Sequence, residues 1–379
     1  MNINETLSQL ENTGNYRHIP GEDNGTAVDM TSNDYLGLAS RRDLREEFFA
    51  HHAPGDMVMS ASASRLLGLR QNEFTSLERL LSDCYGREAL LMNSGYHANV
   101  GLIQALADKR TLIVADKLVH ASIIDGIRLS GAPFERFRHN DYDHLNRILD
   151  SKAGDYSNVL IVAESVYSMD GDRSDIGRLA EAKRRCKTNA LLYIDEAHAV
   201  GVEGPGGLGL TAASGLTAET DIVIGTLGKA LASTGAYAVM SHEMREFMIN
   251  RARSLIFSTA LPPICAAWSE FIIRRSLGMD SERRKLAELS RLLADTLGCD
   301  EASHIRPLIV GDPHKAVELS HHLLDDGFKV LPIRTPTVPA GTERLRFSLS
   351  ASLDASDIKR LGESLGRHNV REGGAGNEA

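Results

Sequence analysis

The run Asp195-Glu196-Ala197-His198 and the run Thr226-Leu227-Gly228-Lys229-Ala230 decide how this sequence folds. The first follows the apolar stretch 191–194 and the second follows the apolar stretch 222–224. Short apolar stretches of this kind are typical of buried strands. A carboxylate, an imidazole and an amine therefore come just after strand ends, which is where ligands bind in an open α/β sheet. A lysine in that position, with the other two groups available, is what a cofactor held as a Schiff base requires.

The same alternation of short apolar runs and amphipathic stretches extends outward from these two runs. Helical periodicity is found between many of the apolar runs, for example over 99–107, 121–129 and 176–186. The predicted strands are 89–92, 112–115, 134–137, 159–163, 191–194, 222–225 and 237–240. Strands separated by helices predict an α/β fold with one large, mostly parallel seven-stranded sheet covered on both faces.

The pattern changes after residue 262. A long helix is expected over 264–276, followed by a smaller α+β block with helices at 315–325 and 355–365 and strands at 328–331 and 345–349. The predicted organisation is an N-terminal segment (1–36) with a short helix at 5–12, a large domain (37–262), a C-terminal α+β domain (263–372) and a disordered tail (373–379).

Composition favours an enzyme of the cytoplasm. The chain has 379 residues, 42% hydrophobic and 25% charged, and a net charge of -9, which argues against a nucleic-acid or anionic-membrane partner. Its four cysteines form no CxxC pair, so neither a disulfide framework nor a metal site is expected. No apolar stretch approaches the roughly 18 residues of a membrane span, and no signal peptide is evident.

Lys229 and Asp195 each have an ordinary interpretation, as a solvated loop charge and as a turn cap. Their joint placement at neighbouring strand ends favours a catalytic role for both residues. An aspartate opposite a pyridine nitrogen keeps that nitrogen protonated, and a protonated pyridine is the electron sink that stabilises a carbanion.

The run 93–99 lies between a predicted strand and a predicted helix. Ser94 and Gly95 can present backbone N–H groups at the helix N-terminus, where a phosphate is attracted, although a plain serine-capped turn explains them equally well. His120, at the start of another helix, either caps that helix or lies flat on a cofactor ring.

Two further patterns resemble nucleotide-binding motifs but lack residues or elements that those motifs require. Residues 195–198 spell the DEAH tetrapeptide of helicases, but Gly228-Lys229 is followed by alanine and lacks the first glycine of a P-loop. The glycine-rich run 204–209 does not lead from a strand directly into a helix, so it favours a mobile loop over a dinucleotide site.

Alternation in the late strand places Arg344 and Arg346 on one face. One of these arginines could bind a carboxylate through two hydrogen bonds, and the alternative is an exposed face with two solvated cations.

In this order, the runs resemble the α-oxoamine synthases, which are pyridoxal-phosphate enzymes of the fold-type I aminotransferase architecture. The likeness extends from 31–38 to Arg346 through the runs 93–99, 118–122, 164–172, 195–201, 226–229 and 258–259. It implies a pyridoxal 5'-phosphate cofactor and a homodimer with active sites at the subunit interface. The runs 138–141 and 334–342 are most similar to the branch that joins L-alanine to a pimeloyl thioester carried by coenzyme A or by an acyl carrier protein.

The resemblance also implies a role for each matching residue. Lys229 would hold the cofactor, Asp195 would pair with its pyridine nitrogen and His120 would stack on its ring. The further cofactor contacts implied are Ser94, Gly95, Tyr96, Glu164, Ser168, His198 and Thr226, with Ser258 and Thr259 of the partner subunit. Asn33 and Arg346 would meet the substrates, with Arg346 taking the amino-acid carboxylate.

One segment departs from the family pattern. Relatives have a glycine-rich stretch that ends Gly-Gly-Ser/Thr-Arg and then a histidine, whereas this chain has small residues at 60–64 before Arg65, and Asn72 and Glu73 where the histidine would fall. Backbone freedom is reduced as a result. The segment faces the acyl substrate in relatives, so the acyl donor is left open.

Two other functions are compatible with the sequence. One is a sister enzyme that joins glycine to a different acyl-CoA, or a quorum-signal synthase of the same family. The other is a non-catalytic dimeric relative that keeps the fold for partner binding, which the joint presence of Lys229, Asp195, His120 and His198 disfavours.

Overall fold

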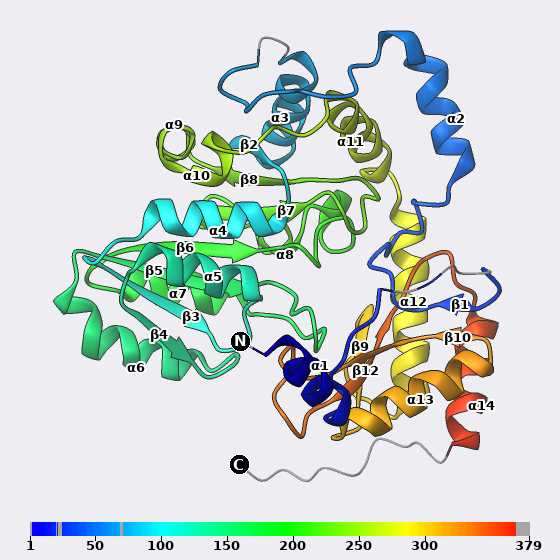
Figure 1. Cartoon of the computed structure of the whole chain (residues 1–379). Coiled ribbons are helices and arrows are strands. Elements are labelled where there is room, and N and C mark those ends of the chain that lie inside the picture. Colours follow the sequence, from blue (N-terminus) through cyan, green and yellow to red (C-terminus); the bar gives the residue numbers. More distant parts are fainter. Residues whose placement is uncertain (1, 20, 22–24, 69–70, 369–379) are drawn as a thin grey trace. The chain divides into compact units, whose positions relative to one another are not determined.

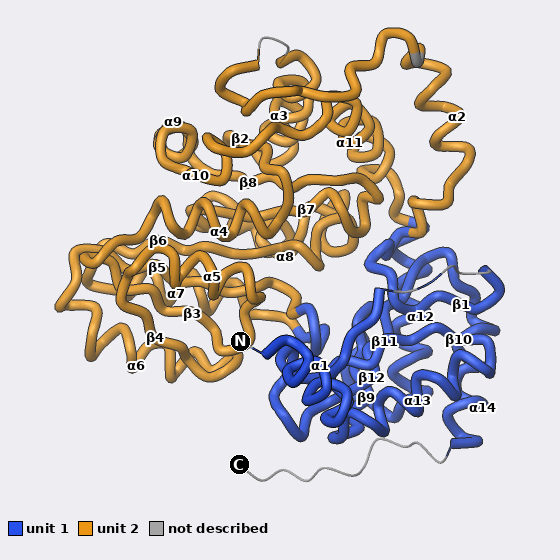
Figure 2. Tube along the Cα trace, in the orientation of Figure 1, with its two compact units in different colours: residues 1–36, 168–172, 281–379 blue, residues 37–167, 173–280 orange. Residues whose placement is uncertain are grey.

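The computed structural model describes residues 2–19, 21, 25–68 and 71–368 (Figure 1). The chain divides into two compact units (Figure 2). The larger contains residues 37–167 and 173–280, and the smaller contains 1–36, 168–172 and 281–379. The helix that follows residue 262 thus belongs to the larger unit, and the N-terminal segment belongs to the smaller one. The predicted disordered tail, 373–379, lies outside the described residues.

A seven-stranded sheet forms the centre of the larger unit. Its strand order is β2-β8-β7-β6-β5-β3-β4, and β8 runs antiparallel to both of its neighbours while the remaining pairs are parallel. The predicted α/β fold with a mostly parallel sheet is confirmed. The strands are β2 (Glu88–Met92), β3 (Thr111–Asp116), β4 (Phe134–Phe137), β5 (Asn158–Glu164), β6 (Asn189–Asp195), β7 (Ile222–Thr226) and β8 (Ala236–Met240).

Helices follow most of these strands and cover the sheet. They are α2 (Arg42–His51), α3 (Asn72–Tyr85), α4 (Gly95–Leu106), α5 (Ala121–Ser130), α6 (Tyr142–Lys152), α7 (Ile176–Arg185), α8 (Leu210–Ala213), α9 (His242–Arg251), α10 (Arg253–Ile256) and α11 (Pro263–Ser276). Capping residues determine where several of these helices begin or end. Asp141 and Asp175 cap the N-termini of α6 and α7, and Gly86 ends α3 at a positive φ of 66°.

Alternating side chains of the central strands build a core on each face of the sheet. Ile113 of β3 packs on the face covered by α4, α5, α9 and α10, whereas Leu112 and Val114 pack against α6 and α7 on the other face. Ile113 and Val114 have no exposed surface. Because each such side chain contributes about 1.5–3 kcal/mol when fully buried, these two cores hold the strands in register.

Within the residues that the structure describes, the smaller unit combines two short sheets with four helices. One sheet is antiparallel with the order β11-β12-β9, and the other pairs β1 with β10 in parallel. Its strands are β1 (Val28–Asp29), β9 (Ile305–Ile309), β10 (Phe328–Lys329), β11 (Leu331–Ile333) and β12 (Arg344–Ser348). Its helices are α1 (Ile3–Asn12), α12 (Asp280–Leu297), α13 (Pro313–Asp325) and α14 (Ala355–Arg367).

Candidate active site

The carboxyl edge of the parallel strands brings together most of the predicted cofactor residues. Glu164 ends β5 and Asp195 ends β6, and the two are register partners, while Thr226 ends β7 next to them. A cavity of about 170 Å³ lies at this edge. Its lining residues are Gly95, Tyr96, Asn99, His120, Ser122, Glu164, Asp195, Ala197, His198, Thr226 and Lys229. Eight residues predicted from sequence therefore share one cavity.

Lys229 contacts His198 across this cavity. The lysine Nζ and the histidine Nε2 are 2.7 Å apart, and His198 is buried. The neighbouring Leu227 and Ala230 have no exposed surface, which fixes the backbone on both sides of the lysine. The amine is thus held at the cavity wall beside a second nitrogen base.

Asp195 presents a buried carboxylate to the cavity. Its Oδ1 accepts the Ala197 N–H at 2.9 Å, and its Oδ2 accepts the Asn99 side-chain amide at 2.7 Å. Glu164 is buried too, and its Oε1 has no hydrogen-bond partner in the part of the chain that the structure describes. Burial, reinforced by the charge of Asp195, raises the pKa of Glu164 well above its ordinary value. Two buried acids facing one cavity fit a ligand that brings a protonated ring nitrogen.

The N-terminus of α4 forms a second wall. Ser94 caps the helix by accepting the His97 N–H at 3.2 Å, and the N–H groups of Gly95 and Tyr96 have no acceptor among the described residues. The Thr226 hydroxyl lies on the same cavity. A helix N-terminus with a nearby hydroxyl suits a phosphate group, so the cavity fits both ends of pyridoxal phosphate.

His120 lies at the start of α5. Its Nδ1 is 2.7 Å from the Ser122 Oγ and accepts the Ser122 N–H at 3.2 Å. Desolvation by the surrounding protein, assisted by the Lys229 cation against the opposing effect of Asp195, lowers the pKa of His120. Asn99 and Ser122, which line the cavity beside it, were not predicted as site residues.

Three predicted residues belong to the smaller unit. Arg346 donates from Nε to the Ser168 carbonyl at 2.7 Å and from Nη2 to the Asn33 Oδ1 at 3.1 Å. Arg346 and Arg344 are both buried, and Arg344 pairs with Asp170. Two solvated arginines on an exposed strand face are therefore ruled out for β12.

Ser258 and Thr259 do not line the cavity. The Asn93 side chain, at the start of the α4 loop, donates to the Ser258 Oγ at 2.8 Å and to the Thr259 carbonyl at 2.5 Å. Thr259 is exposed and Ser258 is half-buried. Their predicted contact with a phosphate in the partner subunit stays a prediction.

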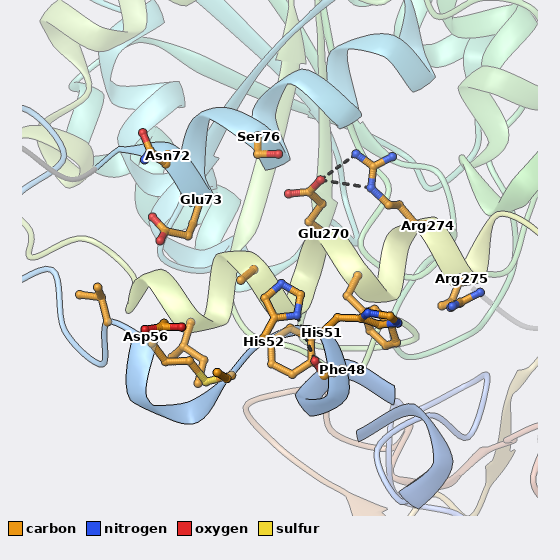
Figure 3. Close-up of a pocket in the computed structure, with 16 residues that line it drawn as sticks. Phe48, His51, His52, Asp56, Asn72, Glu73, Ser76, Glu270, Arg274 and Arg275 are labelled. Atoms are coloured by element: carbon orange, nitrogen blue, oxygen red, sulfur yellow. Dashed lines mark hydrogen bonds and ion pairs between the residues drawn. The ribbon is translucent and has the colours of Figure 1, made fainter. Parts of the chain in front are cut away.

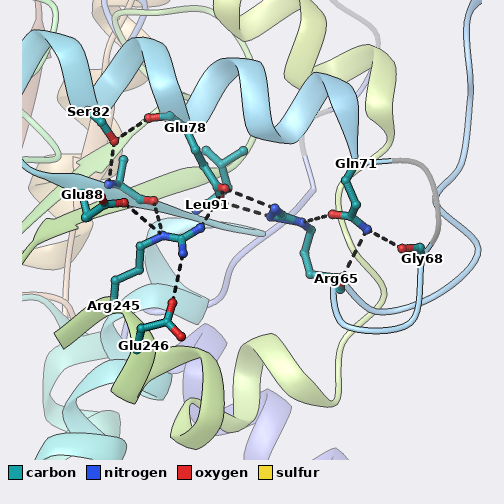
Figure 4. Close-up of polar contacts among 10 residues, drawn as sticks. Arg65, Gly68, Gln71, Glu78, Ser82, Glu88, Leu91, Arg245 and Glu246 are labelled. Carbon is teal, nitrogen blue, oxygen red and sulfur yellow. Dashed lines mark hydrogen bonds and ion pairs between the residues drawn. The ribbon is translucent and has the colours of Figure 1, made fainter. Parts of the chain in front are cut away.

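The segment that departs from the family pattern is held by an ion pair between half-buried Arg65 and buried Glu78, drawn in Figure 4. Arg65 donates to both carboxylate oxygens of Glu78, at 3.0 and 3.2 Å, and Arg245 reaches the same carboxylate at 3.2 Å. Glu78 also accepts the Leu91 N–H of β2. Ser62 adopts a φ of +52°, a conformation that favours glycine, and its N–H donates to the Ser60 Oγ.

The glycine-rich run 204–209 is fixed to the site through Glu196. This buried carboxylate accepts the Leu210 and Thr211 N–H groups at 2.9 and 2.7 Å and the Ser165 hydroxyl at 2.7 Å. Gly209 has a φ of +94°, and a Cβ there would lie 2.5 Å from the Glu196 Oε2. The run therefore packs against the residue that follows Asp195.

A larger cavity, of about 590 Å³, lies between α2, α3 and α11 (Figure 3). Phe48, His52 and Asp56 line one side, and Glu73 and Glu270 line the others. Glu270 accepts two hydrogen bonds from Arg274, and His52 Nδ1 is 3.0 Å from the Phe48 carbonyl. None of the predicted site residues lines it.

Within the described residues there is no group of three or more His, Cys, Asp or Glu side chains that could hold a metal ion. In the same residues, none of the helices is long and apolar enough to cross a membrane.

Comparison with known proteins assigns the family. The model of aminotransferase class I and II matches residues 26–365. A Pasteurella multocida protein provisionally named 8-amino-7-oxononanoate synthase is 46% identical over 362 residues, which cover 94% of this chain and 92% of the relative.

Solved structures agree with this assignment. A serine palmitoyltransferase determined with pyridoxal phosphate has a TM-score of 0.86 and 27% identity, covering 97% of this chain and 98% of that one. An 8-amino-7-oxononanoate synthase from Francisella tularensis has a TM-score of 0.75 and 26% identity, covering 92% of this chain and 98% of that one.

The chain belongs to the aminotransferase class I and II family, and within it to the α-oxoamine synthases. It is an enzyme of the acyltransferase type, and pyridoxal phosphate as its cofactor is confirmed by this membership.

Proposed function

We propose that the chain is an 8-amino-7-oxononanoate synthase. In this reaction, L-alanine and a pimeloyl thioester form a carbon–carbon bond, and carbon dioxide and the free thiol leave, which is a step of biotin biosynthesis. The observation that carries the proposal is the single cavity where the Lys229 amine, the Asp195 carboxylate and the N-terminus of α4 meet. Relatives of that provisional name at 43–46% identity from Pasteurella and Haemophilus support the choice of substrates.

The residues around the cavity divide the cofactor contacts between them. Lys229 would form the covalent link, Asp195 would accept the pyridine N–H, and His120 would lie against the ring. The phosphate would be held by the N–H groups of Gly95 and Tyr96 and by the Thr226 hydroxyl. When bound, pyridoxal phosphate supplies the electron sink that stabilises a carbanion at the α-carbon of the amino acid.

Lys229 is the group that moves the proton. Its Nζ would take the α-proton of the amino-acid substrate and later return a proton to the product carbon. His198 Nε2, at 2.7 Å, holds the amine in position for this transfer. Asp195, which is buried, would lie against the ring nitrogen, and its carboxylate would favour the protonated form of that nitrogen.

The substrate contacts are part of the proposal. Arg346 is a buried cation whose Nε and Nη2 are oriented by the Ser168 carbonyl and the Asn33 amide oxygen. A guanidinium fixed in this way is suited to a carboxylate, so we assign the alanine carboxylate to Arg346. Asn33 would orient it and contact the substrate.

We further propose a cytoplasmic homodimer. Ser258 and Thr259 do not line the cavity of their own subunit and accept hydrogen bonds from Asn93, as expected of residues that reach a neighbouring subunit. Sedimentation of the purified chain should give a dimer mass, and a monomer that turns over would contradict this part.

The test is a matrix of substrates. Purified enzyme would be given alanine, glycine or serine, each with pimeloyl-CoA, pimeloyl carrier protein, acetyl-CoA or palmitoyl-CoA, while thiol release and product mass are recorded. Alanine with a pimeloyl thioester should give the highest kcat/KM and a product of the mass of 8-amino-7-oxononanoate. The Lys229→Ala variant is the negative control for every combination of amino acid and thioester.

A serine-specific enzyme is the second candidate, because the serine palmitoyltransferase structure has the higher TM-score, 0.86 against 0.75. Preference for serine with palmitoyl-CoA would establish that function instead, and preference for glycine would move the chain to another sister enzyme.

A further inference from the structure

Asn99 occupies the centre of a buried hydrogen-bond network below the cavity. It lies on α4, and only 2% of its surface is exposed. Its Nδ2 donates to the Asp195 Oδ2 at 2.7 Å and to the Ser122 Oγ at 2.9 Å, and its Oδ1 accepts the Tyr193 hydroxyl at 2.7 Å. Tyr193 and Ser122 have no exposed surface, so solvent does not compete for these contacts.

The chemistry of the partners fixes the direction of every bond. An ionised Asp195 carboxylate only accepts, so the amide nitrogen of Asn99 must face it. The amide oxygen then faces Tyr193, whose hydroxyl donates. With both hydrogens of the amide in use, the Ser122 Oγ is also an acceptor toward Asn99.

The Ser122 hydroxyl proton is therefore left for His120. The Nδ1 of His120 accepts the backbone N–H of Ser122, which can only donate, so that nitrogen carries no proton. The hydroxyl 2.7 Å away donates to the same nitrogen. Two donors at Nδ1 leave the ring neutral, with its single proton on Nε2.

We propose that Asn99 is a positioning residue that sets two groups of the active site at once, the Asp195 carboxylate directly and the His120 ring through Ser122. This inference rests on the proposed function, since Asp195 and His120 are the groups assigned to the two sides of the cofactor ring. One amide thereby couples the group that binds the ring nitrogen to the group that lies on the ring face.

The experiment compares Asn99→Leu with Ser122→Ala in the full-length chain. Cofactor affinity is measured by titrating cofactor-free protein with pyridoxal phosphate. The pKa of His120 is measured by NMR on histidine-labelled, cofactor-free protein, with the signal assigned through His120→Gln. The charged groups that act on His120 are Asp195 of β6, Lys229 after β7 and Asp125 of α5, and neither variant changes them.

Asn99→Leu should weaken cofactor binding about tenfold to a hundredfold, because a hydrogen bond to the Asp195 charge is lost. It should also raise the His120 pKa by about 0.5–1 unit, because Ser122 is no longer held as a donor to Nδ1. Ser122→Ala should raise the His120 pKa similarly while weakening cofactor binding less than Asn99→Leu does, because the hydrogen bond from Asn99 to Asp195 remains. Ser290→Ala, a buried serine of α12 that donates to the Leu286 carbonyl, is the matched control and should change neither quantity.

Unchanged cofactor affinity and an unchanged His120 pKa in Asn99→Leu would overturn the proposal. A change in cofactor affinity alone would contradict the part of the proposal that concerns His120. If Asn99→Leu does not fold, Tyr193→Phe replaces it. Loss of the hydroxyl at the Asn99 Oδ1 frees the amide to turn, so both quantities should move in the same directions by a smaller amount. Wild-type protein that binds no pyridoxal phosphate would count against the proposed function, whereas the His120 measurement would still decide the Ser122 half of this proposal.

Discussion

The Nζ atom of Lys229 and the Nε2 atom of His198 lie 2.7 Å apart. The two residues come from loops that follow neighbouring strands, β6 and β7, so the contact depends on the parallel register of the sheet. The distance is that of a hydrogen bond between the two nitrogens, so the lysine amine is held beside an imidazole at the cavity wall.

Lys229→Ala should abolish turnover, because the amine that links to the cofactor and takes the α-proton is removed. Lys229 is only partly buried, so the midpoint of thermal unfolding of the cofactor-free chain should change little. Thiol release from pimeloyl-CoA and a melting curve check both outcomes. Turnover that survives the substitution would remove the mechanism.

Glu164→Gln should stabilise the cofactor-free chain at neutral and alkaline pH. The pKa of Glu164 is raised by folding, so between the ordinary glutamate pKa and the raised value the folded state keeps a proton that the unfolded state has lost. Wild-type stability therefore falls as pH rises through this window, by up to about 1.4 kcal/mol per pH unit for one proton.

Denaturant unfolding from pH 4.5 to pH 8 measures this difference. The free-energy advantage of Glu164→Gln should be absent at the acid end and grow with pH. Glu181→Gln, on the exposed side of α7, removes a carboxylate from the surface and is the control. Parallel curves for the wild type and Glu164→Gln would contradict the burial argument.

Glu196→Gln should destabilise the chain by about 1–3 kcal/mol, because an amide nitrogen would replace an oxygen that accepts a backbone N–H. Either Leu210 or Thr211 would lose its acceptor, because the two N–H groups bond to different oxygens of Glu196, and the run 204–209 would loosen. Glu203→Gln breaks only the exposed pair with Arg173 and should cost less than about 1 kcal/mol. Equal losses in the free energy of unfolding, measured with denaturant for the two variants, would contradict this prediction.

Glu78→Ala should cost up to about 3–5 kcal/mol, because it leaves the half-buried Arg65 cation without its carboxylate. Glu88 also approaches Arg245 but is 45% exposed, so Glu88→Ala should have a much smaller effect. Chemical denaturation compares the two variants. Proteolysis near residues 60–68 should increase only in Glu78→Ala, since Arg65 anchors that segment.

The large sheet could be predicted because most of its strands are short apolar runs between turns, as 159–163 and 222–225 illustrate. Strand β9 was missed, because Pro307 interrupts its apolar pattern. The structure tolerates this proline because β9 pairs only with β12 and lies at the sheet edge. Strand β1 has two residues, too few for any periodicity. Helix α12 was also missed, although Leu286, Leu289, Leu293 and Leu297 have helical spacing.

The sequence predicted those residues of the candidate site whose own side chains can bind the cofactor or transfer a proton. Lys229, Asp195, His198 and His120 were predicted, and the structure places all four on one cavity. Asn99 and Ser122 could not be found in the same way. Their importance comes from hydrogen bonds to Asp195 and His120, which exist only once α4 and α5 have packed on the sheet.

The parallel pairing of Val28 with Phe328 has a consequence for how the protein is made. During synthesis, strand β1 leaves the ribosome long before its partner exists, whereas every strand of the large sheet is available once residue 240 has emerged. The large unit can therefore complete its sheet on the ribosome while the N-terminal segment waits. The smaller unit closes last, so a nascent chain becomes a complete enzyme only when its final hundred or so residues have joined its first.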